Sequence, residues 1–325
     1  MAKDIDYVNG VISAKEVFLL GGKISKLCEL SAEDAFRSVA ESGFGKGAEA
    51  VSVYEYESLL LADERDLDAF IREYSPSKAE SAYLLAPRDF HNAKAILKAY
   101  CLDASADKML APEGLLGIEE ITRAVKEEDY KCLGKELAEA VESSFALFKE
   151  ENTDVVSGAK IGVIFEKALY KYLLNACAKN LMLKKLIVKK VDMTNILTFL
   201  RSKTYEYAVE SFIEGGKLKV EQLEKLFSEN AEEVAGCLDR TEYKDFLSLC
   251  LDDKSKGLPF TRAELIRDDL EIAFLAERKY ELKRTQPFLY YVLRRRAENQ
   301  DLRILFVCLL AGMGESDIKK RLRAI

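Results

Sequence analysis

The sequence is poor in residues that break helices and in residues that build catalytic and metal sites. Its 325 residues include five prolines, one histidine and no tryptophan. No proline lies between residues 113 and 258, and alanine, leucine, glutamate and lysine dominate the composition. Because proline is the strongest helix breaker and these four residues favour helix, we predict an all-α fold.

Histidine and cysteine are too scarce or too scattered for the common metal and hydrolytic sites. His91 is the only histidine, and the seven cysteines contain no CxxC pair. The cysteines lie at least thirteen residues apart, which argues against a zinc cluster. A hydrolytic triad would have only His91 as its base, and the sequence shows no nucleophile elbow to go with it. We predict no metal site, no cofactor and no catalytic residue. The cysteines are expected to be small buried hydrophobes in a reducing compartment.

The sequence also lacks long apolar runs and an excess of positive charge. No run approaches the ~18–20 apolar residues that span a bilayer, and the N-terminal MAKDIDYVNG lacks the apolar centre of a signal peptide. The net charge of −7 argues against a nucleic-acid partner. We expect a cytoplasmic protein, with no small-molecule substrate, that acts at a membrane only from outside the lipid.

Two glycine-rich stretches fail the tests for nucleotide binding. GGKIS, residues 21–25, lacks the GxxxxGK[ST] spacing of a phosphate-binding loop, and GFGKGAEA, residues 43–50, lacks a preceding strand. Adjacent acidic pairs along the helices are typical of solvated faces. An enzyme that uses a cysteine or a carboxylate pair stays as an alternative.

An acidic residue followed three positions later by an amide or acid recurs four times. The copies are Asp6 and Asn9, Asp89 and Asn92, Asp192 and Asn195, and Glu298 and Asp301. Residues three and four apart share one helix face. We therefore predict a structural role, in which the pair caps a helix or bonds the backbone of a neighbouring loop. His91 falls on the side of Lys94 and Lys98, and a surface role is expected for it.

A glycine turn and a second helix follow each copy. The glycines are Gly21 with Gly22, Gly114, Gly215 with Gly216, and Gly312 with Gly314. The second helices are AEDAFRSVAE, IEEITRAVKE, VEQLEKLFSE and the shorter ESDIKKRL. Their apolar residues lie four apart on one face, at Ala35 and Val39, Ile121 and Val125, Leu223 and Phe227, and Ile318 and Leu322.

These repeats predict the organisation of the whole chain. One such unit cannot bury its own apolar faces and needs its neighbours. We expect a single helical domain over residues 1–325, with internal repeats at about 1–87, 88–190 and 191–295 and a closing half-repeat at 296–325. The architecture predicted is three pseudo-symmetric helical lobes around a common axis.

Positive charge gathers near the C-terminus. Residues 278–325 hold twelve basic and five acidic residues, a local balance of +7 that leaves −14 on the rest. Arg294, Arg295 and Arg296 lie in one helix in LRRRAENQ. Two interpretations stay open: docking to an acidic partner surface, or ordinary solvation with pairing to Glu298.

The motifs DYVNGVISA, PRDFHNAKAILKA, VDMTNILTFLR and PFLYYVLRRRAENQDLRILFVCLLAGM together resemble the C subunit of the bacterial and archaeal V-type (A-type) ATPases. That family is similar to the d subunit of the vacuolar enzyme. The matching residues are Tyr7, Asn9, Arg88, Asp89, Asn92, Asp192, Asn195, Pro287, Phe288, Tyr291, Arg295, Glu298, Leu302 and Arg303. The sequence departs from the family pattern at Val11, Ser13 and Asp301, which affects contact details.

The resemblance implies an all-helical funnel of three similar lobes with no catalytic site. Such a rotor component rests on the proteolipid ring, at the cytoplasmic face of the membrane, and receives the central-stalk subunits of D and F type. It couples ATP synthesis or hydrolysis to proton or sodium transport. Expected partner contacts are Gly21, Gly22, Gly215, Gly216, Arg294, Arg295 and Arg296. The alternative is a stand-alone helical-repeat scaffold.

Overall fold

The computed structural model describes residues 4–16, 19–46, 48, 52–150, 158–228, 230–276 and 284–322. Every regular element in these ranges is a helix and none is a strand, so the predicted all-α class is confirmed. None of the described helices combines the length and the apolar character that a membrane span requires. The chain forms two compact units, residues 1–77 with 268–325, and residues 78–267.

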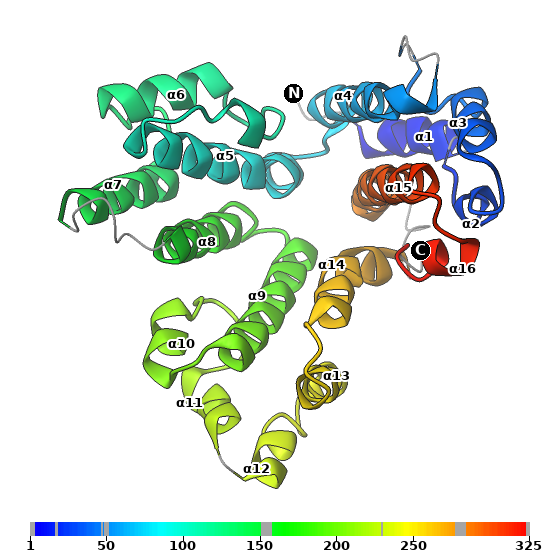
Figure 1. Cartoon of the computed structure of the whole chain (residues 1–325). Coiled ribbons are helices and arrows are strands. Elements are labelled where there is room, and N and C mark those ends of the chain that lie inside the picture. The colour runs from blue at the N-terminus through cyan, green and yellow to red at the C-terminus, as the bar shows by residue number, and fades with distance from the viewer. Residues whose placement is uncertain are drawn as a thin grey trace. The chain divides into compact units, whose positions relative to one another are not determined.

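The first unit is built from both ends of the chain. Its helices are α1 Ile5–Lys15, α2 Lys23–Leu27, α3 Ala32–Glu41, the 3-10 turn η2 Val53–Glu55, α4 Tyr56–Tyr74, α15 Gln286–Leu310 and α16 Glu315–Lys319. Figure 1 shows the red helix α15 beside the blue N-terminal helices, and α15 contacts α1, α2, α3, α4 and α16. The C-terminal helix therefore supplies the centre of an otherwise N-terminal unit.

Apolar side chains on one face of α15 fill this centre. Leu302, Leu305 and Phe306 are fully buried. The ring of Phe306 lies 6.1 Å from that of Phe36 on α3 and 5.4 Å from that of Tyr56 on α4, measured between centroids. Buried aromatic contacts of this kind contribute strongly to core stability.

The second unit is also built from helices. Its elements are α5 Lys78–Cys101, the 3-10 turn η3 Asp107–Met109, α6 Ile118–Glu127, α7 Lys135–Glu150, α8 Gly158–Ala176, α9 Leu181–Arg201, α10 Tyr205–Ser211, α11 Val220–Leu223, the 3-10 turn η4 Glu224–Phe227, α12 Ala231–Gly236 and α13 Lys244–Ser255. Helix α14, Thr261–Ala276, begins in this unit and ends in the other. Helices α6, α7 and α8 pack on α5, while α10 and α13 pack on α9 (Figure 1).

The start of α9 is fixed to α5 by one asparagine. Asn180 caps α9, because its Oδ1 accepts the Leu183 N–H at 3.1 Å. Its Nδ2 donates to the buried carboxylate of Glu80 at 2.9 Å. The side chain thus satisfies a free N–H at the helix end and joins two helices of the unit.

The predicted inner faces of the second helices are confirmed. Ala35, Val39, Ile121 and Val125 are fully buried, as are Leu223 and Ile318, whereas Phe227 and Leu322 are half-buried. The third of these helices is split, since α11 passes into the tighter 3-10 turn η4. Short 3-10 turns of this kind commonly end a helix.

We predict that Phe306→Ala lowers the free energy of unfolding by about 3–5 kcal/mol, because it leaves a cavity between α3, α4 and α15. The matched control is Val307→Ala on the same helix, where the side chain is 51% exposed and the change is expected to be about 0.5 kcal/mol or less. Denaturant titration followed by circular dichroism measures both. Equal destabilisation by the two variants would contradict the packing described.

Candidate interaction site

Two of the predicted motifs lie beneath glycine turns and bond their backbone. The Asp89 carboxylate accepts the N–H groups of Leu115 and Leu116 at 3.0 and 3.1 Å. In the same way the Asp192 carboxylate accepts those of Lys217 and Leu218, at 3.1 and 2.9 Å. We call this arrangement, one buried carboxylate accepting two neighbouring backbone N–H groups, the carboxylate brace.

The asparagine of each motif bonds the chain three residues before the glycine. Asn92 donates to the Ala111 carbonyl at 3.2 Å and accepts its N–H at 2.8 Å. Asn195 makes the same exchange with Ile213, at 2.8 and 2.9 Å. A side-chain amide has the same donor and acceptor as a peptide group, so each asparagine pairs with the loop as a neighbouring strand would.

A third brace joins the two ends of the chain. Glu298 on α15 accepts the N–H groups of Leu20 at 3.0 Å and Gly21 at 2.8 Å. From the order of the motifs along the sequence, Glu298 was expected to go with the glycine turn that follows it, at Gly312 and Gly314. The structure instead brings Glu298 to the first turn, because α15 packs within the N-terminal unit.

The remaining motif residues take other positions. Asp6 is exposed at the start of α1, where its backbone N–H donates to the Asp4 carboxylate at 2.8 Å. Asn9 is buried and its Nδ2 donates to the Arg284 carbonyl at 3.5 Å. Asp301 is buried on α15, 4% exposed.

The short reach of aspartate explains the glycines. A Cβ added at Gly114 would lie 2.2 Å from Oδ1 of Asp89 and 2.6 Å from the carbonyl oxygen of Leu85, and one at Gly216 would lie 2.1 Å from Oδ1 of Asp192. Glu298 is one methylene longer. The equivalent position of its turn, just before the two donors, is accordingly a leucine, Leu19.

Tyr243 is a third donor to the Asp192 carboxylate, and no sequence motif predicted this role for it. Its hydroxyl donates to Oδ2 of Asp192 at 2.6 Å. Burial, followed by this bond to a carboxylate, raises the pKa of Tyr243 well above its usual range. The tyrosine therefore stays protonated and keeps donating.

A family model described as ATP synthase (C/AC39) subunit matches residues 8–321. The chain belongs to this family. Among curated proteins, the C subunit of the A-type ATP synthase of Methanosarcina barkeri is 26% identical over 249 residues, which cover 73% of this chain and 68% of that protein. The resemblance drawn from the motifs is confirmed, and the C/AC39 subunit is a structural part of an ATP synthase and not a catalytic one.

Three of the expected contact residues meet at one place. Gly21, Gly22 and Arg294 line a small cavity of about 120 Å³ together with Glu298 and Asp301. Nη2 of Arg294 lies 3.5 Å from Oε1 of Glu298. Gly22 is exposed and has open space where a Cβ would be. Nothing in the local sequence pattern indicates that α15 packs at this turn.

The three consecutive arginines do not form an open basic face. Arg295 is 6% exposed: its Nε donates to the Asp63 carboxylate at 2.9 Å, and its guanidinium lies 4.3 Å from the centre of the Phe44 ring. Burial raises the pKa of Asp63, and Arg295 opposes that effect. Arg294 and Arg296 are half-buried. Arg295 thus anchors α15 to α4, and its guanidinium faces the interior.

One residue of the second pair of expected contacts, Gly215, borders a wider groove. Gly215, with φ at +97°, lines a groove of about 680 Å³ together with residues of α7, α8 and α10. A Cβ there would lie 2.2 Å from Cδ1 of Leu174, so this glycine lets the turn rest on α8. Lys171 and Glu139, which both line the groove, form an ion pair at 3.1 Å. No local sequence motif indicated this groove, because its lining residues come from several helices that meet only in the folded protein.

The expectation that the cysteines are buried holds for Cys28, Cys177, Cys250 and Cys308, whereas Cys101 and Cys237 are half-buried and Cys132 is exposed. The exposed ring of His91 lies with Nε2 2.8 Å from the Met109 carbonyl oxygen, within the loop that Asn92 also bonds. Burial raises the pKa of the Cys177 thiol to about 11, which disfavours the reactive thiolate. No group of metal-ligating side chains is found in the part of the chain that the structure describes.

We predict that Gly114→Ala lowers the free energy of unfolding by about 2–4 kcal/mol, because the added methyl group displaces the Asp89 carboxylate and its two hydrogen bonds. Gly162→Ala is the matched control. It lies within α8 with nothing near its Cβ position, and a helical glycine-to-alanine change is expected to stabilise by up to about 1 kcal/mol. Urea titration of the two variants decides. Similar stabilities would show that the brace is not needed.

Proposed function

We propose that this protein is a non-catalytic rotor component that joins the central stalk of a rotary ATP synthase to the proteolipid ring. In this role it passes torque between ion transport, of protons or sodium, and ATP synthesis or hydrolysis. The partners are central-stalk subunits of D and F type and the ring, which it meets from the cytoplasmic face of the membrane. Membership of the C/AC39 family supports the proposal.

The repeated carboxylate brace is the observation that carries it. The braces lie on α5, α9 and α15, whose 24, 21 and 25 residues make them the longest described helices. A helix of this length spans about 30–40 Å. Pinning each one to a turn by charged hydrogen bonds resists bending and sliding under load, as a torque-bearing part requires.

The brace also suggests how the lobes are composed. Each lobe would contain one braced helix, its glycine turn and the amphipathic helix that follows. The closing half-repeat at 296–325 then belongs with residues 1–87, as the Glu298 bonds indicate. Three such lobes around a common axis form the proposed funnel, with the glycine turns and the half-buried Arg294 and Arg296 as partner contacts.

Affinity capture of the tagged protein from native membranes tests the proposal. We expect central-stalk subunits and proteolipids to be recovered together, since one rotor component holds both. Recovery of neither would favour the stand-alone scaffold.

A variant pair in the same assay tests the first glycine turn. Gly22→Gln adds a side chain to an exposed position with open space, and Gly10→Gln does the same on the exposed face of α1. We expect Gly22→Gln to lower partner recovery by about tenfold, equivalent to about 1.4 kcal/mol, with its thermal midpoint unchanged. Equal recovery for both variants would remove this turn from the contact surface.

A further inference from the structure

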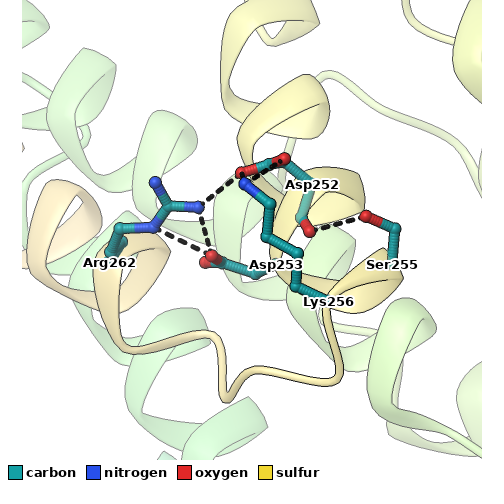
Figure 2. Close-up of polar contacts among 5 residues, drawn as sticks. All are labelled: Asp252, Asp253, Ser255, Lys256 and Arg262. Atoms are coloured by element: carbon teal, nitrogen blue, oxygen red, sulfur yellow. Dashed lines mark hydrogen bonds and ion pairs between the residues drawn. The ribbon is translucent and has the colours of Figure 1, made fainter.

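An ionic cluster links the end of α13 to the beginning of α14. Arg262, in the first turn of α14, reaches back between two consecutive aspartates of α13 (Figure 2). Its Nη2 lies 2.8 Å from Oδ2 of Asp252, and its Nε donates to Oδ1 of Asp253 at 2.8 Å. Nη2 also donates to Oδ1 of Asp253. One guanidinium therefore serves both carboxylates.

Asp253 is the member of this cluster whose charge is buried and therefore unfavourable by itself. It is 1% exposed, and its second oxygen has no hydrogen-bond partner among the described residues. It also lies in the last turn of α13, where the helix dipole disfavours negative charge. A buried carboxylate in such a place is expensive unless a counter-charge is held against it, and Arg262 supplies that charge.

Asp252 and its neighbours hold the guanidinium in place. Lys256 approaches Oδ1 of Asp252 to 2.7 Å, and hydrogen bonds from Lys256 and then Arg262 lower the pKa of Asp252. The chain turns at Gly257, with φ at +63°, and the Leu258 N–H donates to the Asp253 carbonyl at 2.9 Å. This is the left-handed glycine ending typical of helices, so the bend between α13 and α14 has a defined backbone.

A second arginine holds α14 from another side. Arg201, the last residue of α9, donates to Glu264 at 2.8 Å and lies 5.4 Å from the centre of the Phe260 ring. Arginine stacked on an aromatic ring gains a cation–π contribution. The first two turns of α14 are thus tied to α13 by Arg262 and to α9 by Arg201.

We infer that Arg262 is a latch that locks the root of α14 to the unit of residues 78–267. Helix α14 is continuous over Thr261–Ala276, and the boundary between the two units falls within it, after Arg267. A latched root makes this helix a stiff connection, whereas an unlatched root makes it a hinge. The consequence for coupling rests on the proposed function; the latch itself does not.

Hydrogen exchange of the full chain tests the latch. In Arg262→Gln we expect the amides of residues 250–266 to exchange about tenfold faster or more, because Asp253 loses its counter-charge. In the double variant Asp253→Asn with Arg262→Gln the buried charge is gone, and exchange should be slower than in Arg262→Gln alone. The matched control is Arg37→Gln, which breaks a 3.7 Å ion pair between side chains that are 70% and 58% exposed, and which should leave residues 250–266 unchanged.

Two results would overturn the latch. One is wild-type exchange over residues 250–266 in Arg262→Gln. The other is an equal rise across α5 to α8, which would show general loss of stability and no local release.

The coupling consequence is tested in the assembled ATP synthase. With Arg262→Gln we expect unchanged recovery of partner subunits, continued ATP hydrolysis and a loss of ions transported per ATP. Fast exchange with an unchanged ion-to-ATP ratio would overturn the role in coupling. If the wild-type protein recovers no partners, the proposed function fails while the exchange result still stands.

Discussion

Beneath each braced turn, a buried carboxylate accepts two neighbouring backbone N–H groups of that turn. Hydrogen bonds to a charged acceptor contribute about 1.5–3 kcal/mol each, and losing the carboxylate removes the acceptor of both backbone donors. Aspartate reaches the turn only if the turn has no side chain in the way, which is why Gly114 and Gly216 are glycines. This contact ties each of the three long helices to its turn.

Much of this design was predictable from residues close together in the sequence. The all-α class follows from composition, and the structural role of the Asp-x-x-Asn motif follows from helical spacing. The turn bonded by Asp192 lies only 25 and 26 residues away. Glu298 differs because its turn is 278 and 277 residues away. The sequence pattern predicts that Glu298 bonds the nearer glycine turn at Gly312 and Gly314. Only the tertiary packing of α15 brings it to the turn at Leu20 and Gly21 instead.

The arginines show a second limit of local patterns. Three in a row suggest a solvated basic surface, yet Arg295 is held by Asp63, which is 232 residues away on α4. Asp63 does carry a signal of its own, since it lies between Leu59 and Leu67 on the apolar face of a helix whose buried residues include both. A charge on such a face predicts a buried partner without naming it. Part of the positive charge near the C-terminus is therefore neutralised inside the protein.

The closing of the first turn by Glu298 has a consequence for how the chain is made. The ribosome releases Leu20 and Gly21 early, but the carboxylate and the helix they require emerge only after residues 78–267, whose two braces are internal. During synthesis the middle of the protein can mature while its beginning waits with apolar surface uncovered. A message truncated before α15 would yield a product in which residues 78–267 can fold, while the N-terminal helices lack α15 and leave apolar side chains exposed. Chaperones and proteases bind apolar surface of this kind.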